Sequence, residues 1–506
     1  MNKETQKKLG KAIKYMDSNK IGIFVGFLFL LSLIPIIYVG LHNYPTGDDY
    51  WYGALNYHGF QKAGIIGALK GSVQTVIQFY EEWQGTWFTI FLFTLVPSNF
   101  VEGGYVITVF IALGTFLGGL LYMADYYLIK KLNFTKGATI TIVCMVSYLW
   151  IQYMPKTTSG LYWFNGVMHY SVPFCLACIA VVNTHKYVES KKIRNYVALF
   201  ITFTLLGGGS YLAPLAATLA AVLILCCQLK IEEFNLKEKK IKLQYDYKNL
   251  WVIVAIIAEM IGLVISFLSP GNNVRGGEEF GLSIKWIVEC IYYSIDRGIY
   301  LGVDYFTENI VTTAVYLLLA VIVWQQLFRS DREKIKFSNP LLFVIYTNGI
   351  YWATYAPEIY SRSDVSGGVN NTYFLIFLLG TLANMIYVHG WLQCKIKAKY
   401  DIGIVSKFII VGIILLGTCI NISEIKTTND YCLEYIKSGE MEKFVAVHEE
   451  QHRILSDKTI KNAVVPETKG MYPILNMYLT EDKNYPFNID KAFYYEKESI
   501  VAYMVE

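Results

Sequence analysis

The most chemically suggestive segment of the sequence carries two neighbouring carboxylates, Asp48 and Asp49, directly after the first apolar run. Adjacent acids repel each other, so one of them is easier to protonate, or the pair attracts a divalent cation such as Mg or Mn. Either property suits a general base that takes a proton from a hydroxyl group. The alternative is a solvated turn in which an Asp caps the next helix. The residues alone leave both interpretations open.

A second segment combines aromatic rings with an amide and an imidazole, in Trp163, Asn165, His169 and Tyr170. Ring faces pack against the C–H bonds of a sugar, and amide groups bond to its hydroxyls. We therefore expect these four side chains to bind a sugar or an acceptor. The alternative is the ordinary aromatic belt at a membrane–water boundary.

A third segment, residues 269–277, is suited to an anion. Its glycines allow backbone N–H groups to point at a bound ion, and Arg275 can hold a phosphate through two hydrogen bonds. Basic residues are scarce in the neighbouring loops, which makes Arg297 and Arg362 notable. We expect these three arginines and Asn272 to bind a phosphate. An arginine that meets lipid phosphates is the alternative.

Glu259 lies in the middle of the apolar run 250–268. An acid inside a membrane is costly and by default indicates a function. A proton or cation relay, as in a transporter, is one interpretation. A hydrogen bond to a Ser, Thr or Asn on a neighbouring helix is the other.

The segment from His448 to His452 reads H-E-E-Q-H and matches the H-E-x-x-H motif of zinc proteases. Charged Glu450 stands where such helices are usually uncharged, and no clear third ligand follows. We therefore expect an exposed polar helix here and no firm metal site.

The composition indicates that these residues belong to a membrane protein. Of the 506 residues, 54% are hydrophobic, 16% aromatic and only 17% charged, and the mean hydropathy is +0.37. Soluble domains average about 25% charged residues, so a soluble globular protein is disfavoured and disorder is excluded. The net charge of +4 is too small to suggest nucleic acid as a partner.

Eleven apolar segments are candidates for crossing a bilayer. The first, Ile21–Leu41, is long enough to span, so we do not expect a cleaved signal peptide. The others lie near residues 104–129, 137–154, 168–184, 196–206, 211–229, 250–268, 310–328, 340–355, 372–392 and 408–422.

Basic residues predict the orientation of these spans. With the N-terminus in the cytoplasm, the inner segments hold 27 Lys and Arg and the outer ones up to residue 371 hold 7, which is a strong positive-inside signal. The count requires Thr86–Val96 to be a re-entrant or interfacial helix, and it requires a chain reversal at residues 207–209. We expect a multi-pass plasma-membrane protein with a cytoplasmic N-terminus and an extracytoplasmic C-terminus.

Two domains are expected. Residues 1–421 would form an all-α polytopic domain of about eleven transmembrane helices, with interfacial helices in the first outer loop. Residues 422–506 are polar, carry no spanning run and would form a small extracytoplasmic α/β tail.

These features together resemble the GT-C superfamily of membrane glycosyltransferases and, more narrowly, an uncharacterised family of bacterial multi-pass proteins grouped with it. The matching residues are Gly47-Asp48-Asp49-Tyr50, Tyr162-Trp163 with His169-Tyr170, Ser269-Pro270-Gly271-Asn272 with Arg275, and Ala492-Phe493-Tyr494-Tyr495. The resemblance implies a GT-C-like fold, a polyprenyl-phosphate sugar donor, and transfer to a cell-envelope glycan or polymer on the outer face of a bacterial plasma membrane. It also implies that Asp48 or Asp49 is the base and that arginines hold the donor phosphate.

Two other functions remain open from the sequence. A transporter or flippase of lipid-linked sugars would depend on Glu259, and helices broken at the membrane midplane would favour it. A non-catalytic envelope assembly protein would bind glycan through the tail. A lateral groove beside an outer cavity that contains Asp48 or Asp49 would favour the transferase.

Overall fold

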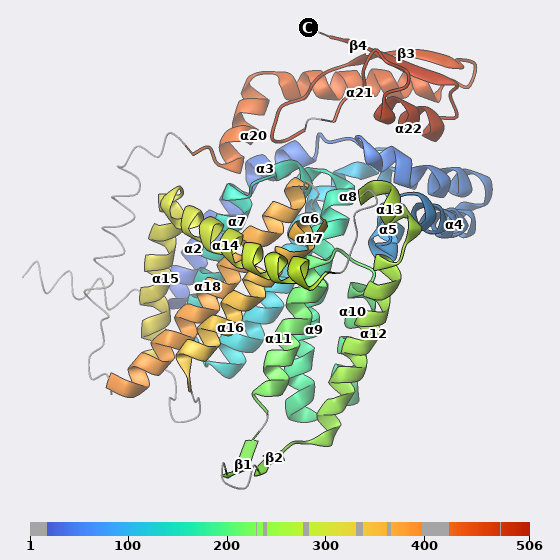
Figure 1. Cartoon of the computed structure of the whole chain (residues 1–506). Helices are drawn as coiled ribbons and strands as arrows, with labels where there is room; N and C mark the ends of the chain where they lie inside the picture. The colour runs from blue at the N-terminus through green and yellow to red at the C-terminus, as the bar shows by residue number, and fades with distance from the viewer. Residues whose placement is uncertain are drawn as a thin grey trace, which may run out of the picture.

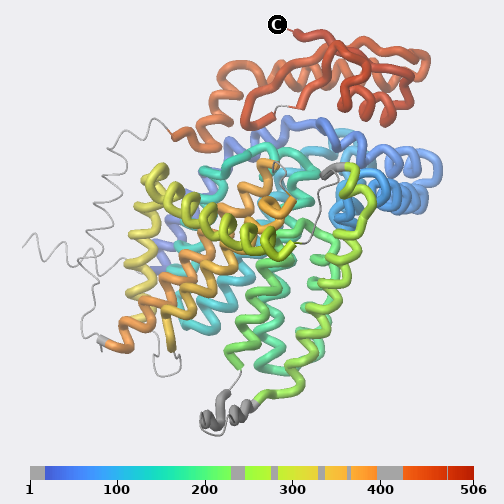
Figure 2. Tube along the Cα trace, viewed as in Figure 1, coloured from blue at the N-terminus to red at the C-terminus, as the bar shows by residue number. Residues whose placement is uncertain are grey.

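A computed structural model of the chain describes residues 18–228, 230–235, 240–276, 283–329, 337–361, 366–396, 425–475 and 477–505. Long helices run side by side as a bundle, and residues 425–505 cover one end of it (Figures 1 and 2). We call this end of the bundle the tail end. The hairpin of β1 (Lys230–Asn235) and β2 (Lys240–Gln244) lies at the opposite end (Figure 1).

The bundle helices are α2 (Ser18–Ser32), α3 (Ile34–Gly40), α6 (Ile107–Ala124), α7 (Lys136–Tyr153), α9 (Val172–Ser190), α10 (Ile193–Leu206), α11 (Leu212–Cys226), α12 (Leu250–Phe267), α15 (Ile310–Arg329), α16 (Pro340–Ala353) and α18 (Gly367–Ile396). Among the described residues, six stretches are long and apolar enough to cross a membrane: Ser18–Gly40, Gly104–Lys131, Phe164–Ser190, Tyr247–Phe267, Ile310–Phe328 and Gly367–Lys395. The structure therefore supports an all-α, multi-pass membrane protein.

The number of spans is less well supported than the class. Four further expected spans correspond to α7, α10, α11 and α16, which do not meet the same criteria, and α10 and α11 are short apolar helices. The expected span 408–422 lies outside the described residues. Eleven crossings therefore remain a prediction.

The bundle contains two hydrophobic cores that share α9. The larger core joins α2, α3, α6, α7, α9, α15, α16 and α18. The smaller core joins the four helices α9, α10, α11 and α12. In the smaller core α10 and α12 cross where Gly207 meets Gly262, because a Cβ on either glycine would lie about 3.0 Å from the other. Small residues allow such close helix crossings. The predicted reversal at residues 207–209 is confirmed, since α10 ends at Leu206 and α11 begins at Leu212.

The first loop at the tail end folds as a helical hairpin within α4 (Asp48–Glu82). The helix breaks at Ala63 and Gly64, where Gly64 has a positive φ of 60°. Asn56 joins the two arms by donating to the Ala68 carbonyl and the Ser72 hydroxyl. The second arm exposes an apolar stripe of Ile65, Ile66, Leu69, Val73 and Ile77. An amphipathic arm of this kind agrees with the expected interfacial helices.

A short apolar helix, α5 (Trp87–Phe93), follows the hairpin. The backbone N–H groups of Phe88 and Thr89 donate to the Gly208 carbonyl, so α5 is anchored on the α10–α11 turn. Two 3-10 turns, η1 (Pro97–Asn99) and η2 (Gly104–Val106), then lead into α6. Helix α5 therefore ends well short of a full membrane crossing. The distribution of basic residues requires that this segment is not a span.

Residues 269–309, which lie between the expected spans 250–268 and 310–328, contain α13 (Pro270–Gly276) and the 24-residue helix α14 (Ile284–Thr307). Helix α14 runs across the bundle helices (Figure 1). It buries Cys290, Ser294 and Gly298, and α17 (Ala356–Ser361) packs against it. Its exposed apolar residues recur at helical spacing without forming a continuous run, which is why a search for spans does not find this helix.

Irregular helical turns and the tail complete the structure. The π-helical turns are η3 (Asp125–Lys131), η4 (Thr158–Tyr162) and η5 (Val167–Ser171), and the other short elements are α8 (Phe164–Gly166) and the 3-10 turn η6 (Tyr247–Asn249). The tail contains α20 (Thr428–Lys437), α21 (Glu440–Ser456), β3 (Asn462–Glu467), α22 (Pro486–Tyr494) and β4 (Ser499–Met504). Strands β3 and β4 pair in parallel from Asn462–Ser499 to Glu467–Met504.

The tail is an α/β unit, as predicted, but it is not a loose appendage. Side chains of α20 and α21, among them Cys432, Tyr435 and Phe444, belong to the larger core of the bundle. The expected domain boundary at 421/422 lies outside the described residues.

Candidate functional site

Asp49 lies in the first turn of α4 and is 1% exposed. The turn before it requires Gly47, which has a positive φ of 52° and occupies the N-cap position. Neither Asp48 nor Asp49 is therefore the N-cap residue. Instead, the Asp49 carboxylate folds back, and its Oδ2 accepts a hydrogen bond from the Thr46 backbone N–H at 3.2 Å.

Two other parts of the chain also donate to this carboxylate. The hydroxyl of Tyr105, at the start of the α6 span, donates to Asp49 Oδ2 at 2.5 Å. The backbone N–H of Asn165 donates to Asp49 Oδ1 at 3.3 Å. Both carboxylate oxygens are thus bonded, and three segments distant in sequence meet at one side chain.

Burial and hydrogen bonding act on Asp49 in opposite directions. Burial, and to a smaller extent the neighbouring Asp48, raise the pKa of Asp49 to about 7 against the lowering effect of its three donors. A carboxyl group whose pKa lies near neutrality is ionised for part of the time at physiological pH and can both accept and release a proton.

Beside this carboxylate lies an amide that has no hydrogen-bond partner in the described part of the chain. Asn165 is 1% exposed, and neither its Nδ2 nor its Oδ1 is bonded. The buried indole N–H of Trp163 and the hydroxyl of Thr46, close in sequence to Asn165 and Asp49, are unpartnered among the described residues in the same way. Buried polar groups are nearly always satisfied, so these atoms are suited to a bound polar molecule or ordered water.

The other two predicted sugar-binding residues face different neighbours. His169 Nδ1 lies 3.1 Å from the Thr89 hydroxyl of α5, and its ring is near Phe93. The Tyr170 hydroxyl is hydrogen-bonded to the Ser366 hydroxyl just before α18. Of the four predicted residues, only Asn165 is bonded directly to the Asp49 carboxylate.

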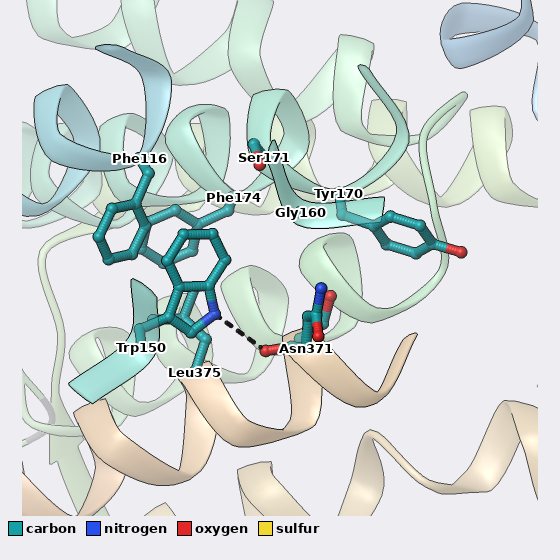
Figure 3. A pocket seen from close by; sticks show the side chains of 9 residues that line it. Phe116, Trp150, Gly160, Tyr170, Ser171, Phe174, Asn371 and Leu375 are labelled. Carbon is teal, nitrogen blue, oxygen red and sulfur yellow. Dashed lines mark hydrogen bonds between the residues drawn. The ribbon is translucent and has the colours of Figure 1, made fainter. Parts of the chain in front are cut away.

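Tyr170 also borders the small cavity shown in Figure 3. Phe116, Trp150, Phe174 and Asn371 are among its other lining residues, and the Trp150 indole N–H donates to the Asn371 carbonyl at 3.1 Å. Its volume is about 10 Å³, which is room for about one water molecule. The cavity is therefore too small for a sugar.

The tail covers the acidic loop. A Cβ on Gly47 would lie 2.7 Å from the sulfur of Met477 and 3.3 Å from the ring of Phe487. Tyr50 packs edge-on against Tyr494 of α22, and the Tyr494 hydroxyl donates to Asn99 Oδ1 at 2.9 Å. The site lies beneath this contact and is closed in the described structure.

Helix α22 brings further charged residues to the junction. Burial, and then the neighbouring Asp48, raise the pKa of Asp490 to about 7. Lys491 is 3% exposed, lies 4.7 Å from the centre of the Tyr50 ring and donates to Gln451 Oε1. Burial lowers the pKa of Lys491 to about 8. Three carboxyl groups from two parts of the chain therefore lie around one junction.

Hydrogen bonds take up most of the capacity of the Asp49 carboxylate to bind a divalent cation. Tyr105 and Thr46 donate to Oδ2 and Asn165 donates to Oδ1, so only one lone pair, on Oδ1, is left for a cation unless a donor is displaced. Within the described residues, no three His, Cys, Asp or Glu side chains come together as a metal site.

The predicted phosphate-binding residues are spread over several elements. Helix α13, which contains Arg275, packs on the end of α4, where Gly271 meets the backbone of Trp83. The Asn272 amide donates to the carbonyls of Ser266 and Phe267 at the end of α12. Arg362 lies outside the described residues.

Arg297 projects from α14, and its side chain is 52% exposed. Its guanidinium lies 4.0 Å from Glu358 Oε1, while the hydroxyl of Tyr373 donates to Glu358 Oε2 at 2.9 Å. Glu358 thus links Arg297 to α18, and among the described residues no hydrogen bond is made by the guanidinium, so its donors suit an anion.

Glu259 is fully buried in α12. The hydroxyl of Thr218 on α11 donates to its Oε2, and Oε1 has no partner among the described residues. The structure therefore contains the hydrogen-bonded arrangement expected of a structural acid, with one oxygen left over.

The H-E-x-x-H segment forms part of α21, but the helix is only half exposed. His448 is buried against Tyr44 and Phe444 and donates to the Phe444 carbonyl. Burial, and then Lys491, lower its pKa to about 3. His452 is on the exposed side, near the Tyr495 hydroxyl. The expected exposed polar helix is therefore found on the side of His452, whereas the side of His448 is packed into the core.

No protein-family model matches the chain, and no curated protein is significantly similar to it. The function is therefore inferred from the site itself.

The sequence did not point to Tyr105, Asn43 or Asp490. The amide of Asn43 donates to the Tyr162 carbonyl at 2.6 Å and so ties the two loops together. Asn43 could have been identified, because it lies in the same segment as the acidic pair. Tyr105 could not, because nothing in the sequence distinguishes it from the other tyrosines among the 40.

Proposed function

We propose that the protein is an integral-membrane glycosyltransferase that moves a sugar from a polyprenyl-phosphate donor to an envelope glycan or polymer. One observation carries the proposal. A buried carboxyl group with a near-neutral pKa, Asp49, accepts from the backbone of Asn165, whose side-chain amide has no hydrogen-bond partner among the described residues. A base next to an empty hydrogen-bonding position suits a hydroxyl acceptor.

In this reaction the acceptor hydroxyl attacks the anomeric carbon of the donor sugar. The new glycosidic bond forms as the bond from the anomeric carbon to the phosphate oxygen breaks. The hydroxyl proton passes to Asp49, and polyprenyl phosphate leaves as an anion. Asn165 and Trp163 would orient the reacting sugar or acceptor through their unpaired polar groups, with His169 and Tyr170 at the border of the site.

Arginine is the residue suited to the leaving phosphate, because its planar guanidinium bonds two oxygens at once. Arg297 has an exposed side chain whose contact to Glu358 is long, while Arg275 and Arg362 are the other candidates. The tail end would face the outside of a bacterial plasma membrane, as the basic residues predict. Because Asp49 is 1% exposed, the acceptor must displace part of the present cover.

Loss of the protein tests this proposal. A deletion strain should accumulate a polyprenyl-phosphate sugar and lose one sugar from an envelope polymer. Wild-type protein should restore both, and Asp49→Asn, expressed at the same level, should restore neither. Unchanged lipid-linked sugars and unchanged envelope polymers in the deletion strain would contradict the proposal.

A transporter or flippase of lipid-linked sugars is the second candidate, favoured by the unpartnered Oε1 of Glu259. It predicts that Glu259→Gln abolishes function and that Asp49→Asn does not. The same complementation experiment therefore separates the two functions.

A further inference from the structure

We infer that Tyr105 is a hydrogen-bond switch that satisfies Asp49 in both its ionised and its protonated state, and is thereby a positioning residue of the site. The inference rests on the proposed function for its catalytic meaning. The switch itself can be measured without a substrate.

The geometry around the Tyr105 hydroxyl offers two acceptors for a single proton. Asp49 Oδ2 lies 2.5 Å from the phenolic oxygen, and the Tyr162 carbonyl oxygen lies 3.3 Å from it. The backbone N–H of Phe164 donates to the same phenolic oxygen at 3.0 Å. A phenol has one O–H and can accept hydrogen bonds through its oxygen, so its proton can point to only one of the two acceptors at a time.

The charge state of Asp49 decides which acceptor receives the proton. When Asp49 is ionised, the Tyr105 O–H points at the carboxylate and stabilises its charge. When Asp49 gains a proton, its new O–H donates to the phenolic oxygen, and the Tyr105 O–H rotates to the Tyr162 carbonyl. Only the one added proton differs between the two states, and all the heavy atoms are already within reach.

The second acceptor has capacity for this bond. The Tyr162 carbonyl already accepts from the Asn43 amide at 2.6 Å, and a carbonyl oxygen has two lone pairs. Tyr105 itself is 1% exposed, so water does not compete for its proton. A buried base needs such an arrangement, because a charge state without partners is costly in a dry site.

The titratable groups that face Asp49 are few. Asp48 and Tyr50 are on its own helix, and Tyr105 faces it from the start of α6. Asp490 of α22 faces Asp48. The residues that approach from the second loop, Trp163 to Asn165, do not titrate. A change in the titration of Asp49 on altering Tyr105 is therefore interpretable.

Infrared difference spectroscopy of the full chain in nanodiscs, recorded as a pH titration, tests the switch. The carboxylic C=O band that Asp49→Asn removes identifies Asp49, and in the wild type it should titrate near pH 7. Tyr105→Phe removes the hydrogen bond in both charge states, but the charge-assisted bond to the ionised carboxylate is the stronger one, so the midpoint should rise by about one pH unit. Tyr162→Phe is the matched control, since it removes an equally buried hydroxyl but keeps the carbonyl, and its midpoint should stay at the wild-type value. An unchanged midpoint in Tyr105→Phe would overturn the switch.

A second measurement does not depend on the folding of Tyr105→Phe. In wild-type protein with isotope-labelled tyrosine, a phenolic C–O band should shift in step with the Asp49 band, and Asp49→Asn should lack this shift. A tyrosine spectrum that is the same across the titration would also overturn the inference. If the switch is observed but Asp49→Asn complements the deletion strain fully, the transferase proposal fails and the switch stands. If Asp49→Asn is inactive but neither band responds as expected, the reverse holds.

Discussion

Asp49 and Glu259 are both buried carboxylates, but the chain surrounds them differently. Asp49 has donors on both oxygens, supplied by three separate segments at the tail end. Glu259 has a single donor, the Thr218 hydroxyl, and its second oxygen has no partner in the described structure. A negative charge on Asp49 would be stabilised by three hydrogen bonds, and one on Glu259 by one. Hydrogen-bond supply, more than depth of burial, separates a candidate base from an acid that joins two helices.

The largest expected effect comes from removing the base. Asp49→Asn keeps the size of the side chain but cannot take the acceptor proton, so transfer should fall by about 10²- to 10⁴-fold. Asp48→Asn should reduce transfer much less, because Asp48 is only half-buried and affects Asp49 through charge. Transfer measured on membranes with matched protein levels checks both variants. Equal losses in the two would break the contrast between the neighbouring acids.

The pH dependence of transfer should follow the ionisation of Asp49. Only the ionised carboxylate accepts a proton, so activity should rise with pH, level off above about pH 7 and fall about tenfold per unit below it. Stability has the opposite sign. Because the folded-state pKa lies above the ordinary value of 3.8, this group stabilises the fold most below that pH, and the contribution is lost as the pH rises through about 7. A rate profile that is flat from pH 5 to 8 would rule out Asp49 as the base.

Gly47 and Gly64 both have a positive φ, and only Gly47 contacts the tail. Comparing their alanine variants therefore separates the cost of backbone strain from the cost of a clash with the tail. Gly47→Ala should be the more damaging change, because it adds a clash with Met477 to the strain. Gly64→Ala places its methyl group in open space and adds strain alone. We expect a cost of about 1 kcal/mol for Gly64→Ala and about 2–4 kcal/mol for Gly47→Ala. Thermal unfolding in nanodiscs and protease sensitivity of the tail measure the difference, and equal melting temperatures would show that the tail does not press on the acidic loop.

The smallest expected effect is at Glu259. Glu259→Gln preserves the Thr218 hydrogen bond, so transfer should stay within about twofold of wild type and stability within about 1 kcal/mol. Complementation of the deletion strain and thermal unfolding measure these. If Glu259→Gln loses all function while Asp49→Asn stays active, Glu259 and not Asp49 is the functional carboxylate, and the transporter is supported.

Sequence reasoning reached those features that depend on local pattern. Hydropathy indicated a multi-pass helical protein, and charge required both the short helix at Trp87–Phe93 and the reversal after Leu206. The two neighbouring acids identified Asp48 and Asp49 as candidates. The aromatic residues around an amide identified Asn165. Helix α14 was not predicted, because charged residues interrupt its apolar positions and no continuous apolar run marks it.

Contacts between distant segments were beyond the sequence. No local pattern predicts that Tyr105, at the start of a span, points at Asp49, or that α22 supplies Asp490 to the same junction. Nor does motif spacing predict that His448 is buried under Tyr44. Each depends on how the tail docks, which is a tertiary property.

The docking of α22 on α4 also constrains the order of folding. Nε2 of His58 in α4 lies 3.0 Å from the backbone oxygen of Tyr494, a partner 436 positions further along the chain. During synthesis the acidic loop must therefore exist for most of the elongation time without its cover. Such distant pairings form late and expose apolar surface while they wait. If translation stops before α22 is made, Asp49 stays uncovered. The contact between α22 and the acidic loop therefore forms only in chains whose synthesis has passed α22.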